Sequence, residues 1–167
     1  LARTVAFASG PAIGGALVYR ASQSDSKAGG DYVIAALKIP TGGDVISAVA
    51  ADGRVTVTYK LGAMTSVRIF DGNTGKPLRT CEGHTGTITC LDFSADSKRL
   101  VTGGADRKIK IWDVDKGAEL VSINDNPSIV AAVAFHPKGH QIAVGNIDQS
   151  IRLYDAATGK LQNNWVA

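Results

Sequence analysis

The sequence predicts an all-β protein made of repeated four-stranded antiparallel sheets. The first observation is a repeat: the pairs Phe70-Asp71, Trp112-Asp113 and Tyr154-Asp155 follow one another at 42-residue steps (113 − 71 = 42 and 155 − 113 = 42). The second is a polar/apolar alternation of period two, as in KIKIW at Lys108–Trp112, which favours half-exposed strands. The third is the absence of helical periodicity along the chain.

Other residues keep the same step. They are the glycines Gly75, Gly117 and Gly159, the pair Phe93 and Phe135, and the pair Asp106 and Asp148. Independent markers with one period indicate that each 42-residue unit folds in the same way.

Each unit is expected to contain four short strands. In the clearest unit they are Thr87–Phe93, Arg99–Ala105, Lys108–Trp112 and Ala118–Ile123. In the last unit they are Ile129–Phe135, Gln141–Asn146, Ser150–Tyr154 and Lys160–Trp165. Because the connections are short turns containing Gly, Asp and Asn, the strands should pair as antiparallel neighbours.

These sheets must pack against one another, because a small sheet with apolar residues on both faces cannot shield itself from water. Radial packing of four-stranded sheets gives a β-propeller, which commonly has about four to eight blades. The chain is expected to hold about four blades, at approximately residues 1–44, 45–82, 83–124 and 125–167. It would then form about half of a typical ring.

The segment GHTGTITCLDFSADSKRLVTGGADRKIKIWD, residues 83–113, resembles a blade of the WD-repeat β-propeller family. Gly83-His84 opens the segment and Trp112-Asp113 closes it. The resemblance is specific over residues 71–167, fair over 45–70 and weak over 1–44.

The resemblance implies a structural hydrogen-bond network in this blade. Matched by position, its members are His84, Thr102, Asp106 and Trp112. Asp106 would accept from the imidazole, the ring would engage the Thr102 hydroxyl, and that hydroxyl would reach the indole N–H of Trp112. A satisfied buried network of this kind stiffens a sheet.

Two other blades depart from this pattern. In the last blade Asn126-Pro127 replaces Gly-His, Val144 replaces the hydroxyl, Tyr154 replaces Trp, and only Asp148 remains. The blade ending at Asp71 keeps Phe70 and Thr58, but Met64 stands at the position of the turn aspartate. We therefore expect both blades to rely on packing alone.

The first blade is expected to be degenerate. LARTVAFA resembles an innermost strand, GGALVYR a second strand and DYVIAALKI a third, with a polar loop between the last two. The TGG at 41–43 precedes TGK at 74–76 by 33 residues (74 − 41 = 33), so about one strand is missing. The cause is either degeneration of the blade or loss of residues.

The ends of the chain also bear on assembly. The sequence starts at an apparent innermost strand and stops at an outer one, which removes the overlap that closes such rings. Two open apolar faces would then invite pairing. We expect either a fragment of a longer propeller, or a homodimer or partner chain that completes the ring.

Composition excludes several classes of protein. With 18 basic and 15 acidic residues the net charge is only +3, so nucleic acid is not favoured as a partner. Two cysteines are too few for a disulfide scaffold. The sequence contains no run of about 18 apolar residues, so no membrane-spanning helix is predicted. A positive stripe could be formed by Arg107, Lys108, Lys110 and Arg152, but Lys110 and Arg152 occupy equivalent positions on third strands, which favours a solvated sheet edge.

No metal, cofactor or catalytic site is predicted. Cys81-x2-His84-x5-Cys90 has ligand types suited to zinc, with His136 and His140 as further candidates, but these histidines belong to opposite rims of the blades. GNTGKP at 72–77 lacks the first glycine and the Ser/Thr of a phosphate loop. No Gly-x-Ser-x-Gly motif occurs, so we expect no enzyme activity.

The family resemblance implies a non-catalytic scaffold for protein–protein contacts, and we expect a cytoplasmic location. Partners would bind the loops at one rim. The candidate contact residues are Thr85, Thr87, Ala105, Arg107, Pro127, Ile129, Ile147 and Gln149. Of these, Ile129 and Ile147 are the best apolar anchors.

Two alternatives remain open. One is a regulatory or targeting propeller excised from a larger, possibly enzymatic, chain, which fits the missing initiating Met. The other is a nucleic-acid-binding platform, for which affinity would have to fall steeply with salt concentration.

Overall fold

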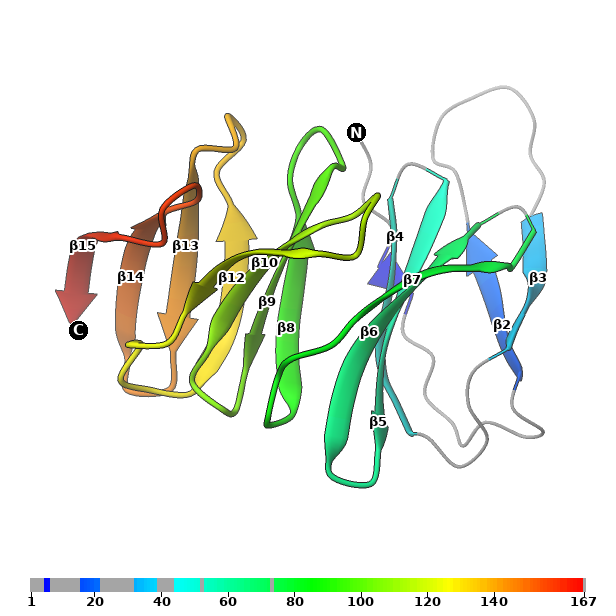
Figure 1. Ribbon diagram of the computed structural model, residues 1–167, viewed down its shortest axis with the longest axis horizontal. Coiled ribbons are helices and arrows are strands. Elements are labelled where there is room, and N and C mark those ends of the chain that lie inside the picture. The colour runs from blue at the N-terminus through cyan, green and yellow to red at the C-terminus, as the bar shows by residue number, and fades with distance from the viewer. Residues whose placement is uncertain are drawn as a thin grey trace. The chain divides into compact units, whose positions relative to one another are not determined.

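The computed structural model describes residues 5–6, 16–21, 32–38, 44–51, 53–72 and 74–166, and every regular element within these ranges is a β-strand (Figure 1). The all-β prediction is therefore confirmed. The described residues contain no helix that is long and apolar enough to cross a membrane. The chain divides into two compact units, Leu1–Thr80 and Cys81–Ala167.

The first unit is built on a sheet with the strand order β1-β4-β5-β6-β7. Its strands are β1 (Val5–Ala6), β4 (Asp44–Ala51), β5 (Arg54–Leu61), β6 (Met64–Asp71) and β7 (Pro77–Cys81). The last four follow one another in the chain, as expected for one blade. A separate two-stranded sheet pairs β2 (Ala16–Ala21) with β3 (Tyr32–Lys38).

Pairing at the start of the chain differs from the sequence expectation. Residues 1–8 are predicted to form the innermost strand of the first blade, beside the strand at 14–20. In the structure β1 pairs instead with β4, with Val5 opposite Val49. The degenerate first blade stays a prediction, since residues 7–15, 22–31 and 39–43 lie outside the described ranges.

The second unit consists of two four-stranded antiparallel sheets. The first contains β8 (Ile88–Phe93), β9 (Arg99–Gly104), β10 (Ile109–Asp113) and β11 (Glu119–Ile123). The second contains β12 (Val130–Phe135), β13 (Gln141–Asn146), β14 (Ser150–Asp155) and β15 (Leu161–Val166). In both sheets the strands are adjacent in chain order, and each lies where the alternation and turn residues predict it.

The acid of each aromatic-acid pair holds the turn that follows the third strand. Asp113 Oδ1 accepts hydrogen bonds from the backbone N–H groups of Asp115 (3.0 Å) and Lys116 (2.9 Å). Asp155 Oδ1 does the same for Ala157 and Thr158. Each turn then closes at a glycine with left-handed backbone, φ 69° at Gly117 and 71° at Gly159. The aspartate and glycine therefore recur together because they build one turn.

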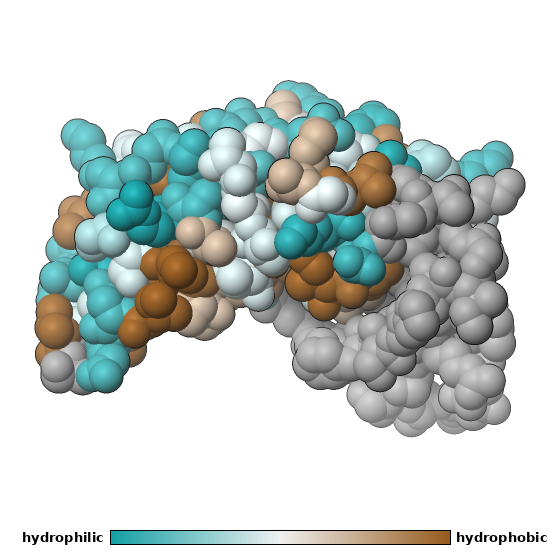
Figure 2. All heavy atoms as spheres, turned by 90° about the horizontal axis from the view of Figure 1, so that it is seen from below, coloured by the Kyte–Doolittle hydropathy of each residue, from teal (hydrophilic) through white to brown (hydrophobic). Residues whose placement is uncertain are grey.

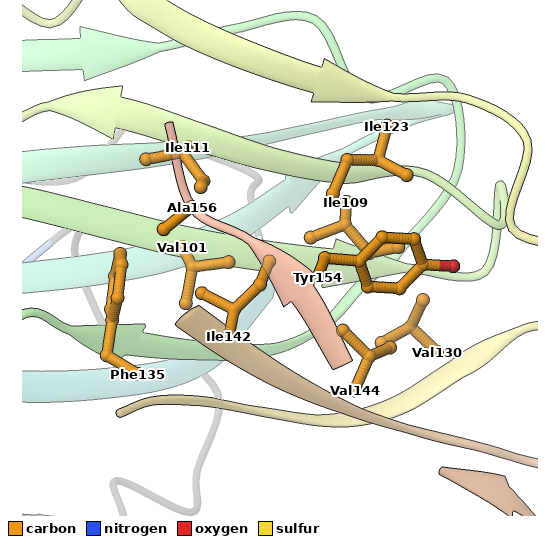
Figure 3. Close-up of a cluster of buried hydrophobic side chains, with 10 residues drawn as sticks. All are labelled: Val101, Ile109, Ile111, Ile123, Val130, Phe135, Ile142, Val144, Tyr154 and Ala156. Carbon is orange, nitrogen blue, oxygen red and sulfur yellow. The ribbon is translucent and has the colours of Figure 1, made fainter. Parts of the chain in front are cut away.

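The core of the second unit lies between its two sheets (Figure 3). Each sheet contributes buried apolar side chains to it. They are Val101, Ile109, Ile111 and Ile123 from one sheet, and Val130, Phe135, Ile142, Val144, Tyr154 and Ala156 from the other sheet and its turn between β14 and β15. The strands alternate, so these residues share one face of each sheet. Two blades thus shield each other, as the sequence predicts.

Hydrogen bonds also join the two sheets. The Thr89 hydroxyl donates to the carbonyl of Val130 (2.5 Å), and the Asp92 carboxylate accepts from the backbone N–H of Phe135 (2.8 Å). The Arg99 guanidinium donates to the carbonyl of Gly139 (2.5 Å). Because Thr89 meets the start of β12 and Asp92 meets its end, β8 and β12 run side by side in the same direction.

Candidate functional site

A chain of side-chain hydrogen bonds joins four residues of the first sheet in the second unit. His84 Nδ1 lies 2.9 Å from Asp106 Oδ2, and His84 Nε2 lies 2.8 Å from the Thr102 hydroxyl. The indole N–H of Trp112 donates to the same hydroxyl at 2.9 Å. Thr102 and Trp112 are almost fully buried and His84 is 7% exposed. We call these four residues the His84 relay.

The partners of the two ring nitrogens assign the tautomer of a neutral His84. The Asp106 carboxylate can only accept, so Nδ1–H donates to it, and Nε2 then accepts from the Thr102 hydroxyl, whose oxygen accepts the indole proton of Trp112. Burial lowers the pKa of His84, and this outweighs Asp106, which raises it. Burial alone would raise the pKa of Asp106, but the adjacent ring and the N–H of Thr85 bring it below its usual value.

The relay also holds the loops at one end of its sheet. Asp106 accepts hydrogen bonds from the backbone N–H groups of Thr85 (2.9 Å) and Lys108 (3.2 Å). The N–H of Ala105 donates to the carbonyl of Thr87 at 2.8 Å. The loop entering β8 and the turn between β9 and β10 are thereby tied together.

The last blade has a hydrogen-bond network of its own, so the expectation that it relies on packing alone is wrong. The Tyr154 hydroxyl donates to Asn126 Oδ1 (3.2 Å), and Asn126 Nδ2 donates to Asn146 Oδ1 (2.9 Å). Asn146 Nδ2 in turn donates to the Ser150 hydroxyl (3.2 Å), which donates to Asp148 (2.5 Å). We call these five residues the Asn126 relay.

The Asn126 relay occupies the same place in its blade as the His84 relay. Asn126 follows His84 by one 42-residue step, and Tyr154 follows Trp112 by the same step. Val144 takes the position of Thr102 and is fully buried. The missing hydroxyl is replaced by Asn146, whose counterpart in the preceding blade is Gly104. The polar residues Asn126, Asn146 and Ser150 were the signal in the sequence, because all three occupy positions that are buried in the sheet.

The blade containing β5 and β6 lacks this arrangement within its described residues. Strand register places Val57 opposite Arg68, the position that Thr102 takes opposite Lys110. Thr58, the residue that the sequence suggests as the hydroxyl, instead faces the other side of the sheet, opposite Val67. Its side-chain oxygen is buried and has no hydrogen-bond partner among the residues that the structure describes. The cause is a longer hairpin: the paired residues Thr58 and Val67 are nine positions apart, whereas the paired residues Gly103 and Ile109 are six positions apart (67 − 58 = 9; 109 − 103 = 6).

The rim residues predicted from the sequence lie in four loops, residues 82–87, 105–108, 124–129 and 147–149, which we call the rim loops. Two predicted pairs meet through their backbones: Thr87 with Ala105, and Ile129 with Ile147 (3.1 Å). Because β8 and β12 run in the same direction, all four loops lie at one rim of the second unit. Six of the eight candidates are exposed, and the other two are half-buried. The exposed group comprises Thr85, Ala105, Arg107, Pro127, Ile147 and Gln149, and the half-buried group Thr87 and Ile129.

Two of these rim residues have unusual backbone geometry. Arg107 and Gln149 adopt left-handed φ values of 64° and 66° at equivalent places in the two turns. Side chains other than Gly, Asn and Asp rarely take this conformation. The turn aspartates Asp106 and Asp148 lie next to them and accept backbone N–H groups two residues further on, which holds the turns in place.

Lys110 and Arg152 do not lie on a solvated sheet edge. Lys110 is 6% exposed, and its ammonium donates to Glu119 (2.5 Å) and Ser122 (3.0 Å). Arg152 is 8% exposed and donates to the Ser150 hydroxyl at 2.6 Å. Both are third-strand residues whose charged groups are taken up within their own blades, which corrects the interpretation from the sequence.

The residues with metal-binding side chains do not gather into a site in the described part of the chain. Both ring nitrogens of His84 are engaged by Asp106 and Thr102. His136 and His140 stack on each other, with ring centroids 4.9 Å apart. Burial raises the pKa of Cys81 to about 12 and also raises the pKa of Cys90, so neither side chain is a thiolate at neutral pH.

Comparisons with known proteins agree with this geometry. Residues 75–113 match the family model described as "WD domain, G-beta repeat", and residues 122–167 match the "Anaphase-promoting complex subunit 4 WD40 domain". The crystal structure of the computationally designed Ika8 protein is similar, with 26% identity and a TM-score of 0.70. That alignment covers 82% of this chain and 41% of the designed chain, so this chain spans less than half of its length.

The first family match spans β7 to β10, and the second runs from the end of β11 through β15, so each covers most of one sheet of the second unit. WD repeats generally serve as protein–protein interaction scaffolds and are typically non-catalytic. With repeats of 42 residues, four-stranded antiparallel sheets that pack face to face and both family matches, this chain is a partial β-propeller of the WD-repeat family.

Proposed function

We propose that this chain is a non-catalytic scaffold that binds partner proteins through its rim loops. The observation that carries the proposal is the exposure of Ile147. This large apolar side chain is 61% exposed in the turn between β13 and β14. The backbone N–H of Ile147 donates to the carbonyl of Ile129, a residue in the same loop as Pro127. Exposed apolar side chains held at a defined place are suited to be interface anchors.

The rigidity of the rim supports the same proposal. The His84 relay and the Asn126 relay each tie an entry loop to a neighbouring turn, so the rim residues are ordered before any partner binds. Binding by ordered loops costs less conformational entropy than binding by loops that must fold on contact. The partner class that fits is a protein segment with an apolar side chain that can cover Ile147.

Peptide selection on the immobilised chain tests the proposal. Peptides from a displayed library should bind the chain and lose binding to the variants Ile147→Asp and Arg107→Asp. Leu120→Asp is the matched control, because Leu120 is 50% exposed on the outer strand β11, away from the rim loops. Binders that tolerate the rim variants and are lost with Leu120→Asp would contradict the proposal.

Completion of the ring by a second copy or a partner chain stays a prediction. Sedimentation velocity of the chain at micromolar concentration tests the homodimer. A dimer that dissociates on dilution supports it, and a monomer throughout the range excludes it.

A further inference from the structure

The third strands β6, β10 and β14 carry a basic residue at equivalent positions: Arg68, Lys110 and Arg152 follow one another at 42-residue steps (110 − 68 = 42 and 152 − 110 = 42). Two of these charges have an acid in their own blade. The Lys110 ammonium lies 2.5 Å from the Glu119 carboxylate. The Arg152 guanidinium lies 3.5 Å from the Asp148 carboxylate. Arg68 differs, because it has no ion pair or hydrogen bond among the residues that the structure describes.

The sequence explains why Arg68 lacks an acid. In the sheet β8–β11 the acid is Glu119, and its counterpart one repeat earlier is Pro77 (119 − 42 = 77). In the sheet β12–β15 the acid is Asp148, and its counterpart two repeats earlier is Met64 (148 − 2 × 42 = 64). Both positions that supply a carboxylate in the other blades therefore hold uncharged residues in this one.

The Arg68 side chain is nevertheless held in place. Its guanidinium carbon lies 5.2 Å from the centre of the Tyr59 ring, and Tyr59 is 5% exposed. Stacking on an aromatic ring orients a guanidinium and leaves its fork of N–H donors available. Nε of Arg68 is buried without a hydrogen-bond partner in the described chain, so a ligand would meet the two terminal nitrogens. Two parallel N–H donors are the arrangement that binds a carboxylate most specifically.

An exposed apolar pair lies on the same face of the same hairpin. Leu61 and Met64 face each other at the turn between β5 and β6, and they are 46% and 67% exposed. Side chains alternate along a strand, and the register places this pair on the face that carries Tyr59 and Arg68. The turn lies at the lower end of β5 and β6 in Figure 1, and Figure 2, seen from below, shows hydrophobic residues among hydrophilic ones on that side.

We propose that Tyr59, Leu61, Met64 and Arg68, which we call the Arg68 face, bind a segment of a partner protein that carries a carboxylate side chain and, close to it, a large apolar one. The terminal nitrogens of Arg68 donate to the carboxylate, and the apolar side chain covers Leu61 and Met64. The Arg68 face offers one cation, which matches one carboxylate better than a phosphate group of about −1.5 to −2 charge. The inference rests on the proposed scaffold function but concerns the first unit and not the rim loops.

Selection from two displayed peptide libraries tests the inference. In the first library a Glu and a Leu are fixed, with a few random residues between them, and in the second a Gln replaces the Glu. Hydrogen bonds to a charged group contribute more than neutral ones. We therefore expect the chain to enrich binders from the Glu library about tenfold over the Gln library.

Arg68→Gln should abolish the preference for the Glu library. Arg79→Gln is the matched control, because it removes the same charge from an exposed residue of the first unit and should keep the preference. Arg68→Glu should transfer the preference to a third library with Lys in place of the Glu, a reversal that a purely structural role of Arg68 would not produce. Should Arg68→Glu fail to fold, Arg68→Lys replaces it: it keeps the charge without the fork and should reduce the preference to a few-fold.

The Leu61→Ser variant tests the apolar part of the Arg68 face. It should weaken the binders selected from the Glu library, whereas Leu78→Ser, at a 38% exposed leucine on β7, should leave them unchanged. Equal loss in the two variants would contradict the inference.

Three further results would overturn the inference. The first is a Glu library that yields no more binders than the Gln library. The second is equal behaviour of Arg68→Gln and Arg79→Gln. The third is a set of binders that Arg68→Gln retains and Ile147→Asp loses, which would leave the rim-loop proposal standing. Binders that Ile147→Asp retains and Arg68→Gln loses would support the Arg68 face.

Discussion

The Tyr154 hydroxyl donates a hydrogen bond to the side-chain oxygen of Asn126, 3.2 Å away. These two residues stand one repeat after Trp112 and His84, which are joined through Thr102. Two successive blades thus link the loop before the innermost strand to the third strand with different side chains. The 42-residue step repeats the position of a polar link more faithfully than it repeats residue types.

Tyr154→Phe should destabilise the chain by about 1 kcal/mol, because it removes the donor of one buried hydrogen bond and keeps the ring. Urea unfolding at pH 7 measures the change. Gln162→Ala, at an exposed position on β15, serves as control and should change stability by less than about 0.5 kcal/mol. Equal stability of the Tyr154→Phe variant and the parent would show that the hydrogen bond contributes nothing and that packing alone stabilises the last blade.

Trp112→Ala should cost about 3–5 kcal/mol, since it leaves a cavity at a residue that is 2% exposed. Trp112→Phe keeps most of the packing and loses the indole donor, so its cost should be smaller, about 1–3 kcal/mol. Thermal unfolding followed by circular dichroism separates the two. A Trp112→Ala variant that keeps its stability but loses partner binding would make Trp112 a contact residue.

Acid should destabilise the second unit through His84. Burial lowers the pKa of His84 in the folded chain below its ordinary value of 6.5, so the unfolded chain binds a proton that the folded chain resists. Stability is therefore complete above pH 6.5 and is lost as the pH falls from there toward the folded-state pKa. The lowered pKa of Asp106 adds a further loss at more acidic pH, below its ordinary value of 3.8.

The variant His84→Asn tests this origin of the pH dependence. It places at residue 84 the side chain that Asn126 supplies in the next blade. Urea unfolding at several pH values between 5 and 8 should show a shallower loss of stability on acidification than in the parent. The same slope in both proteins would show that His84 is not the titrating group.

Gly103→Ala should cost about 1–3 kcal/mol, because the new methyl group would overlap Val130 of the neighbouring sheet. Gly145→Ala, the equivalent change one repeat later, should be neutral or slightly stabilising, since its methyl group has room. Chemical denaturation of the two variants compares them directly. A loss of the same size at both positions would contradict the packing of the two sheets.

Much of the fold follows from local sequence. In the second unit, period-two alternation fixes the strands, and turns with Asp and Gly fix their ends, as at Asp113 with Gly117. The four members of the His84 relay could be selected from the family resemblance, because the residue types and their spacing are specific. Local signals suffice there because each blade is built from contiguous strands.

The remaining features depend on contacts between distant residues. The Asn126 relay needs Asn146, which stands where the preceding blade has Gly104, so comparison position by position does not reveal it. Thr58 resembles the relay threonine in the sequence, but three additional hairpin residues turn it to the other face. Lys110 looks like a surface residue until Glu119 and Ser122 are placed beside it.

The central claim is that the two four-stranded sheets of the second unit pack face to face as successive blades. Nuclear Overhauser effects measured on the methyl-labelled chain test it most directly. We expect a strong cross-peak between the Val130 methyl groups and the α-protons of Gly103, since a Cβ at Gly103 would overlap that side chain. Absence of this cross-peak in the folded chain, with the strands of both sheets intact, would contradict the account.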